Sequence, residues 1–93
     1  MAATIEIRDV RPGELQVTVI EGASRTTHIV TVDPAYCRKL TGGKADAAEL
    51  VRRSFEFLLA REAKESILGR FALPVIGRYF PEYEQAMRRA FGS

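Results

Sequence analysis

Apolar and polar residues alternate in the first third of the chain. Ile5 and Ile7 alternate with charged residues, and a second segment places Leu15, Val17 and Val19 at every other position. Successive side chains of a strand point to opposite faces of a sheet. This period of two therefore predicts half-buried antiparallel strands.

Turn residues separate these segments from each other and from a third one. Pro12 stands where φ near about −65° is needed and Gly13 where φ must be positive, as in a type II turn. A second turn around Gly22 leads into residues 26–33, which are rich in Thr, Ile and Val. We therefore expect a three-stranded antiparallel meander over residues 1–33. One face of so small a sheet needs a cover, which the rest of the chain must supply.

Helix-capping residues follow the third segment. Asp33 before Pro34 has the pattern of an N-cap and a first helical residue, and Gly42 is suited to end this short helix. Asp46 stands three residues before Glu49, which is the spacing of a capping box. The sequence therefore predicts a short helix followed by the main helix of the protein.

The main helix presents a broad apolar arc and an opposite side crowded with charges. The residues of the arc are Leu50, Val51, Ser54, Phe55, Phe57, Leu58 and Leu59. An arc of this width is typical of a helix that packs on two sides. We expect it to contact both the sheet and the C-terminal tail.

Proline divides the tail into short helical segments. Ile67 and Phe71 lie one helical turn apart, so we expect residues 66–72 to be helical, and Pro74 and Pro81 each introduce a further helix. The last segment is amphipathic. Its apolar face consists of Tyr83, Ala86, Met87, Ala90 and Phe91. The tail should therefore pack against the remainder of the protein.

The predicted fold class is α+β. We expect an N-terminal three-stranded antiparallel meander, residues 1–33, packed against a C-terminal set of four to five short helices, residues 34–93. With 93 residues, of which 46% are hydrophobic, the chain is long enough for a modest core. The size predicts a single domain over residues 1–93.

Charge and composition select no particular partner. Charged residues make up 28% of the chain, and the formal net charge is +2. Residues 1–33 carry three basic against five acidic residues, and the remaining sixty carry 11 against seven, a bias of ordinary size. The one cysteine cannot form an internal disulfide, and no stretch approaches the about 18–20 apolar residues of a membrane-spanning helix. We expect a soluble cytoplasmic protein that does not enter a membrane.

Candidate catalytic and metal-binding residues are few. His28 and Cys37 are the residue types of a thiol–imidazole pair, but structural roles for both are the stronger interpretation. One His and one Cys do not supply the three or four ligands that zinc takes. The run Gly42-Gly43-Lys44 lacks the flanking residues of a phosphate loop. We therefore predict no enzyme, no cofactor and no metal.

Two short predicted helices about a turn, over residues 65–80, have the outline of a helix-turn-helix. Candidate nucleic-acid contacts are Arg70, Arg78, Arg88 and Arg89. The second helix exposes few of the polar side chains that read base edges. Nucleic-acid binding is therefore the alternative hypothesis, and short helices that turn corners over a core are the favoured interpretation.

The preferred hypothesis is a non-catalytic protein-interaction or regulatory module that binds a protein partner or associates with itself. The main helix and the tail together hold more aromatic side chains than so small an interior accommodates with ease. The candidate interface residues are Phe57, Tyr83, Met87 and Phe91. Aromatic and Met side chains are enriched in interfaces. Unpaired strand edges are a second candidate contact.

The tail also carries a resemblance to a known group. The patterns SFEFLLxRExKESIL over residues 54–68 and FxLxxIxxYFPEYE over residues 71–84 resemble the tail of a family of small uncharacterised bacterial proteins. These patterns cover roughly a third of the chain. The resemblance implies a bacterial family of about this length without an assigned activity, and it transfers no functional residue.

Overall fold

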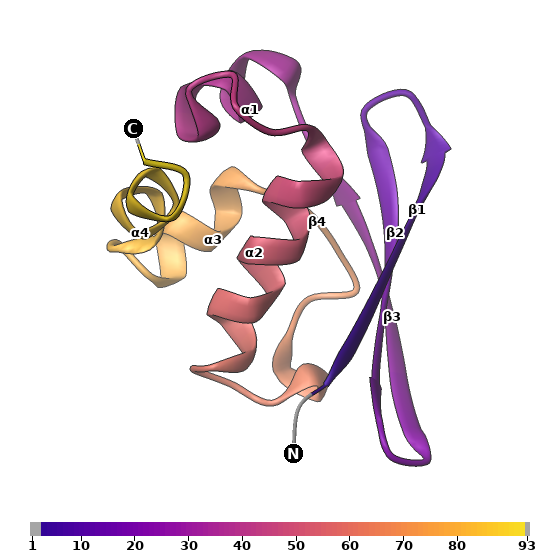
Figure 1. The fold of residues 1–93 in the computed structure, drawn as a ribbon. Coiled ribbons are helices and arrows are strands. Elements are labelled where there is room, and N and C mark those ends of the chain that lie inside the picture. Colours follow the sequence, from indigo (N-terminus) through magenta and orange to yellow (C-terminus); the bar gives the residue numbers. More distant parts are fainter. Residues whose placement is uncertain (1–2, 93) are drawn as a thin grey trace.

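The computed structural model describes residues 3–92. Its elements in chain order are β1 (Thr4–Arg11), β2 (Glu14–Glu21), β3 (Ser24–Thr31), α1 (Pro34–Thr41), α2 (Ala47–Leu59), the 3-10 turn η1 (Lys64–Ser66), β4 (Arg70–Ala72), α3 (Pro74–Tyr79) and α4 (Tyr83–Ala90). The helices lie on one face of the sheet, and the described chain leaves the other face open (Figure 1). The fold class is α+β, as the sequence predicts.

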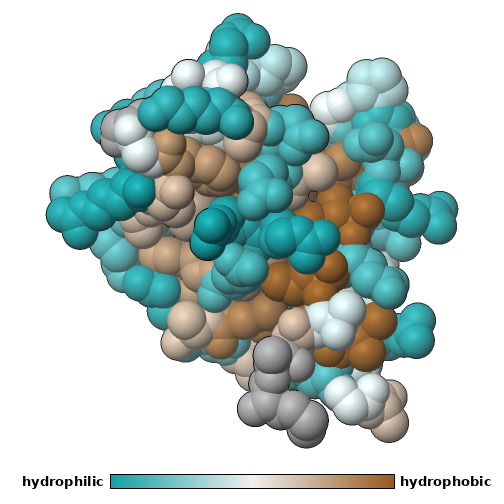
Figure 2. All heavy atoms as spheres, viewed as in Figure 1, coloured by the Kyte–Doolittle hydropathy of each residue, from teal (hydrophilic) through white to brown (hydrophobic). Residues whose placement is uncertain are grey.

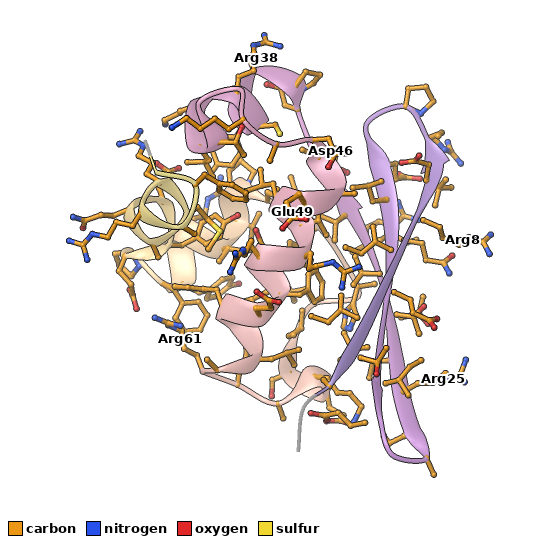
Figure 3. The ribbon with its side chains drawn as sticks, viewed as in Figure 1. Arg8, Arg25, Arg38, Asp46, Glu49 and Arg61 are labelled. Carbon is orange, nitrogen blue, oxygen red and sulfur yellow. The ribbon has the colours of Figure 1, made fainter. Side chains whose placement is uncertain are left out.

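Strands β1, β2 and β3 form the predicted antiparallel meander. Short turns join neighbouring strands, and Gly13 and Gly22 take the positive φ of 78° and 61° that these turns need. The alternating positions Leu15, Val17 and Val19 of β2 are buried, as the period of two predicts. Arg8 and Arg25 point away from the helices on the outer face of the sheet (Figure 3).

The fourth strand is not predicted by the sequence pattern, so the expected helix over residues 66–72 is wrong. β4 pairs in parallel with β3, which makes the sheet mixed, with the order β1-β2-β3-β4. The backbone N–H of Ile29 donates to the carbonyl of Gly69 at 2.8 Å, and that of Leu73 donates to the carbonyl of Thr31 at 3.1 Å. So short a helix is marginal in water, whereas the edge of β3 offers backbone partners.

The predicted N-caps of α1 and α2, Asp33 and Asp46, are confirmed. Asp33 Oδ2 accepts a hydrogen bond from the backbone N–H of Tyr36 at 3.1 Å. Asp46 Oδ1 accepts one from the backbone N–H of Glu49 at 2.9 Å. Gly42 ends α1 with a left-handed φ of 67°. These side chains satisfy amides that lack a partner within the helix, so local sequence sets where both helices begin.

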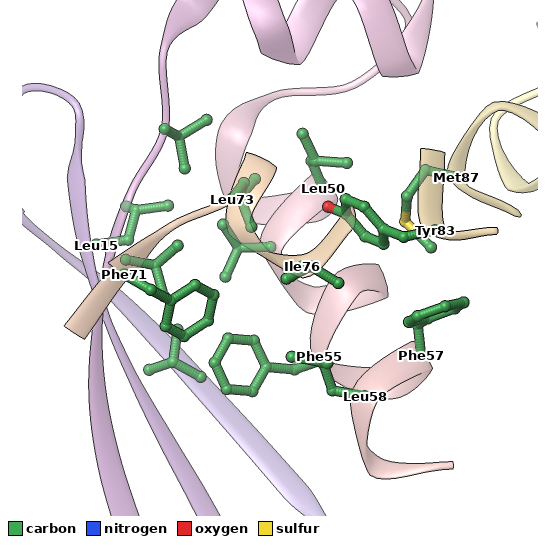
Figure 4. Close-up of a cluster of buried hydrophobic side chains, with 14 of the residues drawn as sticks. Leu15, Leu50, Phe55, Phe57, Leu58, Phe71, Leu73, Ile76, Tyr83 and Met87 are labelled. Carbon is green, nitrogen blue, oxygen red and sulfur yellow. The ribbon is translucent and has the colours of Figure 1, made fainter. Parts of the chain in front are cut away.

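The hydrophobic core lies between the inner face of the sheet and α2, and it continues between α2 and α4. The Phe55 ring centroid lies 5.3 Å from that of His28 and 6.1 Å from that of Phe71. Figure 4 shows Phe55 and Phe71 facing one another, with Tyr83 and Met87 in a second group on the other side of α2. α2 therefore contacts both the sheet and the tail, as its broad arc predicts.

The surface shown in Figure 2 is mostly hydrophilic, with hydrophobic side chains gathered along the seam between the helices and the sheet. On the outer face of the sheet, Arg70 pairs with Glu14 at 3.2 Å. Within residues 3–92, no helix combines the length and the apolar character needed to cross a membrane.

Candidate functional site: an apolar groove beside α3

Three of the four candidate interface residues, Phe57, Tyr83 and Met87, are buried within the protein, which corrects their expected place at the surface. Phe57, Tyr83 and Met87 are 7%, 0% and 4% exposed, and Phe91 is half-buried against the core. Burying an apolar stripe within the chain removes its area from water before any partner is present. α4 therefore presents this stripe to α2.

A buried hydrogen-bond chain joins α4 to α2. Ser54 Oγ donates to the carbonyl oxygen of Leu50 at 2.7 Å, so the Tyr83 hydroxyl, 2.6 Å away, donates to Ser54 Oγ. Burial raises the pKa of Tyr83 above its ordinary value, and the hydroxyl stays protonated as a donor. Met87 Sδ lies 3.8 Å from the same Ser54 oxygen. Tyr83 is therefore a core residue whose polar tip is satisfied.

A second polar contact joins α4 to α1 nearer the surface. The Tyr36 hydroxyl donates to Glu84 Oε2 at 2.7 Å, and Lys39 Nζ lies 3.4 Å from Glu84 Oε1. The hydrogen bond from Tyr36, followed by the charge of Lys39, holds the pKa of Glu84 below its ordinary value. Burial and the same hydrogen bond raise the pKa of Tyr36, which remains a donor at neutral pH.

Acidification is expected to weaken this α1–α4 contact. Because the pKa of Glu84 is lower in the folded than in the unfolded protein, its stabilising effect is present above the unfolded pKa and is lost as pH falls through the folded pKa. Denaturant unfolding should show that wild type has a higher free energy of unfolding than Glu84→Gln at about pH 6. This difference should disappear as the pH falls to about pH 3. The contact is half exposed, so the difference at neutral pH should stay below about 1 kcal/mol. A pH-independent difference, or the same trend in the exposed control Glu6→Gln, contradicts this expectation.

The residues predicted to contact nucleic acid lie on three different elements. Arg70 is on β4 in an ion pair, Arg78 is on α3, and Arg88 and Arg89 are exposed on α4. The helix-turn-helix outline over residues 65–80 is wrong, because η1 and β4 replace its first helix. The segment therefore lacks the helix that would brace a recognition helix against a DNA backbone.

His28 and Cys37 each have partners other than one another. His28 Nδ1 donates to the carbonyl oxygen of Leu68 at 2.8 Å, and Nε2 lies 2.8 Å from the Thr26 hydroxyl oxygen. Cys37 Sγ lies 3.9 Å from the carbonyl oxygen of Ala45, and burial raises the pKa of the thiol. In the described part of the chain, no three His, Cys, Asp or Glu side chains form a group that could hold a metal ion. The geometry of His28 and Cys37 is therefore that of structural residues.

An apolar groove of about 350 Å³ lies between the end of α2, the segment from η1 to β4, and α3. The lining residues are Leu58, Glu62, Ser66, Ile67, Leu68, Phe71, Val75, Ile76, Tyr79 and Phe80. The buried members of this set form the floor. Leu68 and Tyr79, which are 47% and 68% exposed, stand at the rim. The groove is therefore a hollow with an apolar floor and exposed apolar edges.

Long-range contacts hold the walls of the groove in place. The hydrogen bond from His28 to the carbonyl of Leu68 attaches one side of the rim to β3. The buried side chain of Lys64 pairs with Glu21 at 3.1 Å, which ties η1 to the end of β2, and also with its neighbour Glu65 at 2.7 Å. Contacts with β2 and β3 therefore attach the η1–β4 side of the groove to the sheet.

Some charged side chains near the groove form ion pairs and others do not. Arg61 at the end of α2 lies 3.4 Å from Glu82, and its guanidinium carbon is 3.6 Å from the centre of the Phe57 ring. By contrast, Glu62 in the lining and Arg78 on α3 form no ion pair with another described residue. The groove therefore has one unpaired carboxylate in its lining, and one unpaired cation, Arg78, lies on α3 next to the lining residue Tyr79.

The sequence pattern does not predict this groove. The i,i+4 spacing of Val75 and Tyr79 predicts a shared core face, yet Tyr79 is largely exposed. The orientation of α3 depends on β4, which the sequence pattern does not predict. No feature of the sequence indicates that Tyr79 is exposed while its neighbour Phe80 is partly buried.

Comparisons with protein-family models, curated proteins and solved structures found no match for this chain.

Proposed function

We propose that this chain is a non-catalytic protein-interaction module that accepts an apolar side chain of a protein partner in the groove beside α3. The observation that carries the proposal is the rim, where Leu68 and Tyr79 are exposed beside a hollow with a buried apolar floor. Burial of apolar area by a partner is favourable, and contiguous exposed apolar surface marks interaction sites. Aromatic residues are also enriched at interfaces.

The groove lining favours binding over catalysis. Apart from the tyrosine hydroxyl, its polar side chains are Glu62 and Ser66. Neither makes a side-chain hydrogen bond to a base or an orienting group among the described residues. A nucleophile or general base needs such a partner to be activated and positioned. Nucleic-acid binding has lost the helix-turn-helix outline that was its main support.

The proposal is tested by titrating the protein with N-acetyltyrosinamide, an isolated side-chain probe, while amide NMR shifts are recorded. We expect the shifts to be concentrated at Leu68, Val75 and Tyr79, because these residues line the groove. The variant Val75→Glu should weaken binding about tenfold, because a carboxylate in an apolar hollow must be desolvated when the probe enters.

The matched control is Val10→Glu, which places the same charge at an exposed position on β1. This variant should bind the probe as wild type does, and circular dichroism should show both variants folded. Shifts that spread over the outer face of the sheet, or equal binding by both variants, contradict a binding site in the groove.

A further inference from the structure

Tyr79 and the groove form a projection and a hollow on the same surface. Tyr79 is the most exposed large hydrophobic side chain of the described chain, at 68%, so it borders the hollow without filling it. Building on the proposed function, we infer that the partner is a second copy of this chain. Two copies form a two-fold symmetric dimer in which each Tyr79 enters the groove of the other protomer.

Two-fold symmetry requires a self-complementary surface, because the same patch meets itself across the axis. A projection beside a hollow meets this requirement, since the rotation that inserts one Tyr79 also inserts the other. Leu68, which also lines the groove, adds exposed apolar area near the inserted ring. The apolar ring of Tyr79 enters the hollow, and its hydroxyl stays near the polar edge of the interface, as is common for tyrosines at interfaces.

Charge complementarity also favours a second copy. Arg78 directly precedes Tyr79 on α3, and Glu62 lies in the groove lining, both without an ion-pair partner among the described residues. Insertion of Tyr79 into the other groove brings the Arg78 that precedes it toward that groove's Glu62, once on each side of the axis. The formal net charge of +2 leaves little repulsion between copies.

Other surfaces are less suited to self-association. The edge strand β1 carries Glu6, Arg8 and Asp9, and charged side chains on an edge discourage pairing with another strand. The hollow at the β1–β2 turn is lined in part by Asp9 and Arg11. The outer face of the sheet carries Arg25 and further charged residues. Val10 is exposed at the hollow of the β1–β2 turn, but at 41% it is smaller and less exposed than Tyr79, and charged side chains stand on both sides of it.

The predicted dimer is reversible. One ring and its surroundings on each side give a small interface, and interfaces that bury less than about 1,200 Å² in total belong to weak, transient complexes. We expect a dissociation constant of about 10 to 100 μM. Sedimentation equilibrium from about 1 to about 500 μM spans this range and should show a concentration-dependent monomer–dimer equilibrium.

Removal of the projection should abolish most of the association. Tyr79→Ala is expected to weaken dimerisation at least about tenfold, because aromatic anchors in a partner's pocket carry much of the energy of an interface. The matched control Val10→Ala removes another exposed apolar side chain, on β1, and should leave the dissociation constant unchanged. Both positions are exposed, so both variants should keep the wild-type circular dichroism spectrum.

A charge exchange tests the arrangement of the two copies. Glu62→Arg and Arg78→Glu should each weaken dimerisation, because each places like charges across the axis. The double variant should restore affinity to within about threefold of wild type. Failure of the double variant to recover contradicts this arrangement, as does a dimer that is indifferent to Tyr79→Ala.

A protein that stays monomeric over the whole concentration range overturns the inference. The N-acetyltyrosinamide titration then distinguishes failure of the dimer from failure of the groove as a binding site. Probe shifts at Val75 and Leu68 in the monomer leave the groove as a binding site for a different protein. A monomer without such shifts contradicts both the dimer and the proposed function.

Discussion

Replacement of Phe55 by alanine is expected to lower the free energy of unfolding by about 3 to 5 kcal/mol. Phe55 is fully buried, and its ring packs between those of His28 and Phe71 at the junction of α2 with the sheet. Alanine would remove the ring and leave a cavity that β3 and β4 cannot close without breaking their pairing. Single domains are stable by about 5 to 15 kcal/mol, so the loss is a large part of the total.

Urea unfolding followed by circular dichroism measures this loss. The control is Tyr79→Ala, which deletes an aromatic side chain that is 68% exposed and should change stability by less than about 0.5 kcal/mol at dilute, monomeric concentration. Equal losses in the two variants would mean that Phe55 does not occupy the centre of the core.

The variant Tyr83→Glu is expected not to fold. Tyr83 is fully buried, and its hydroxyl reaches only as far as Ser54 Oγ, which already donates to Leu50. A carboxylate there would lose its hydration without gaining a cation, at a cost of several kcal/mol. The variant Tyr83→Phe keeps the ring and removes one hydrogen bond, so it should fold and lose about 1 kcal/mol.

Far-ultraviolet circular dichroism and the dispersion of amide NMR signals distinguish these outcomes. A Tyr83→Glu protein that stays folded and changes its assembly state would reinstate the interface predicted from the sequence for Tyr83, Met87 and Phe91. Loss of folding in this variant, with a folded Tyr83→Phe protein, places α4 in the core as the structure describes it.

Features that depend on a few neighbouring residues were correctly predicted from the sequence. Gly13 adopts the positive φ expected of its turn, and Asp33 and Asp46 accept hydrogen bonds from the first amides of their helices. These interactions span two or three residues, so the residue types and their spacing determine them directly. The same holds for the alternation that places one face of β2 inside the protein.

The start of the tail was predicted incorrectly because its conformation depends on a distant element. Ile67 and Phe71 have helical spacing, but the chain pairs with the edge of β3, and Phe71 lies opposite Val30 in the sheet. A strand is stabilised by hydrogen bonds to the backbone of another segment. The residues of β4 alone therefore do not indicate that the edge of β3 lies beside them. The predicted helix-turn-helix outline over residues 65–80 was wrong for the same reason.

Local chemistry thus settled the meander, the caps of α1 and α2, and the amphipathic character of α4. Long-range packing determined the fourth strand, and it determined which aromatic residues are buried. Tyr83 and Tyr79 both follow helical apolar patterns, yet one is fully buried against α2 and the other is largely exposed at the groove. The reason is that a periodic pattern specifies which side chains share a face of a helix, whereas burial depends on what that face meets in the folded protein.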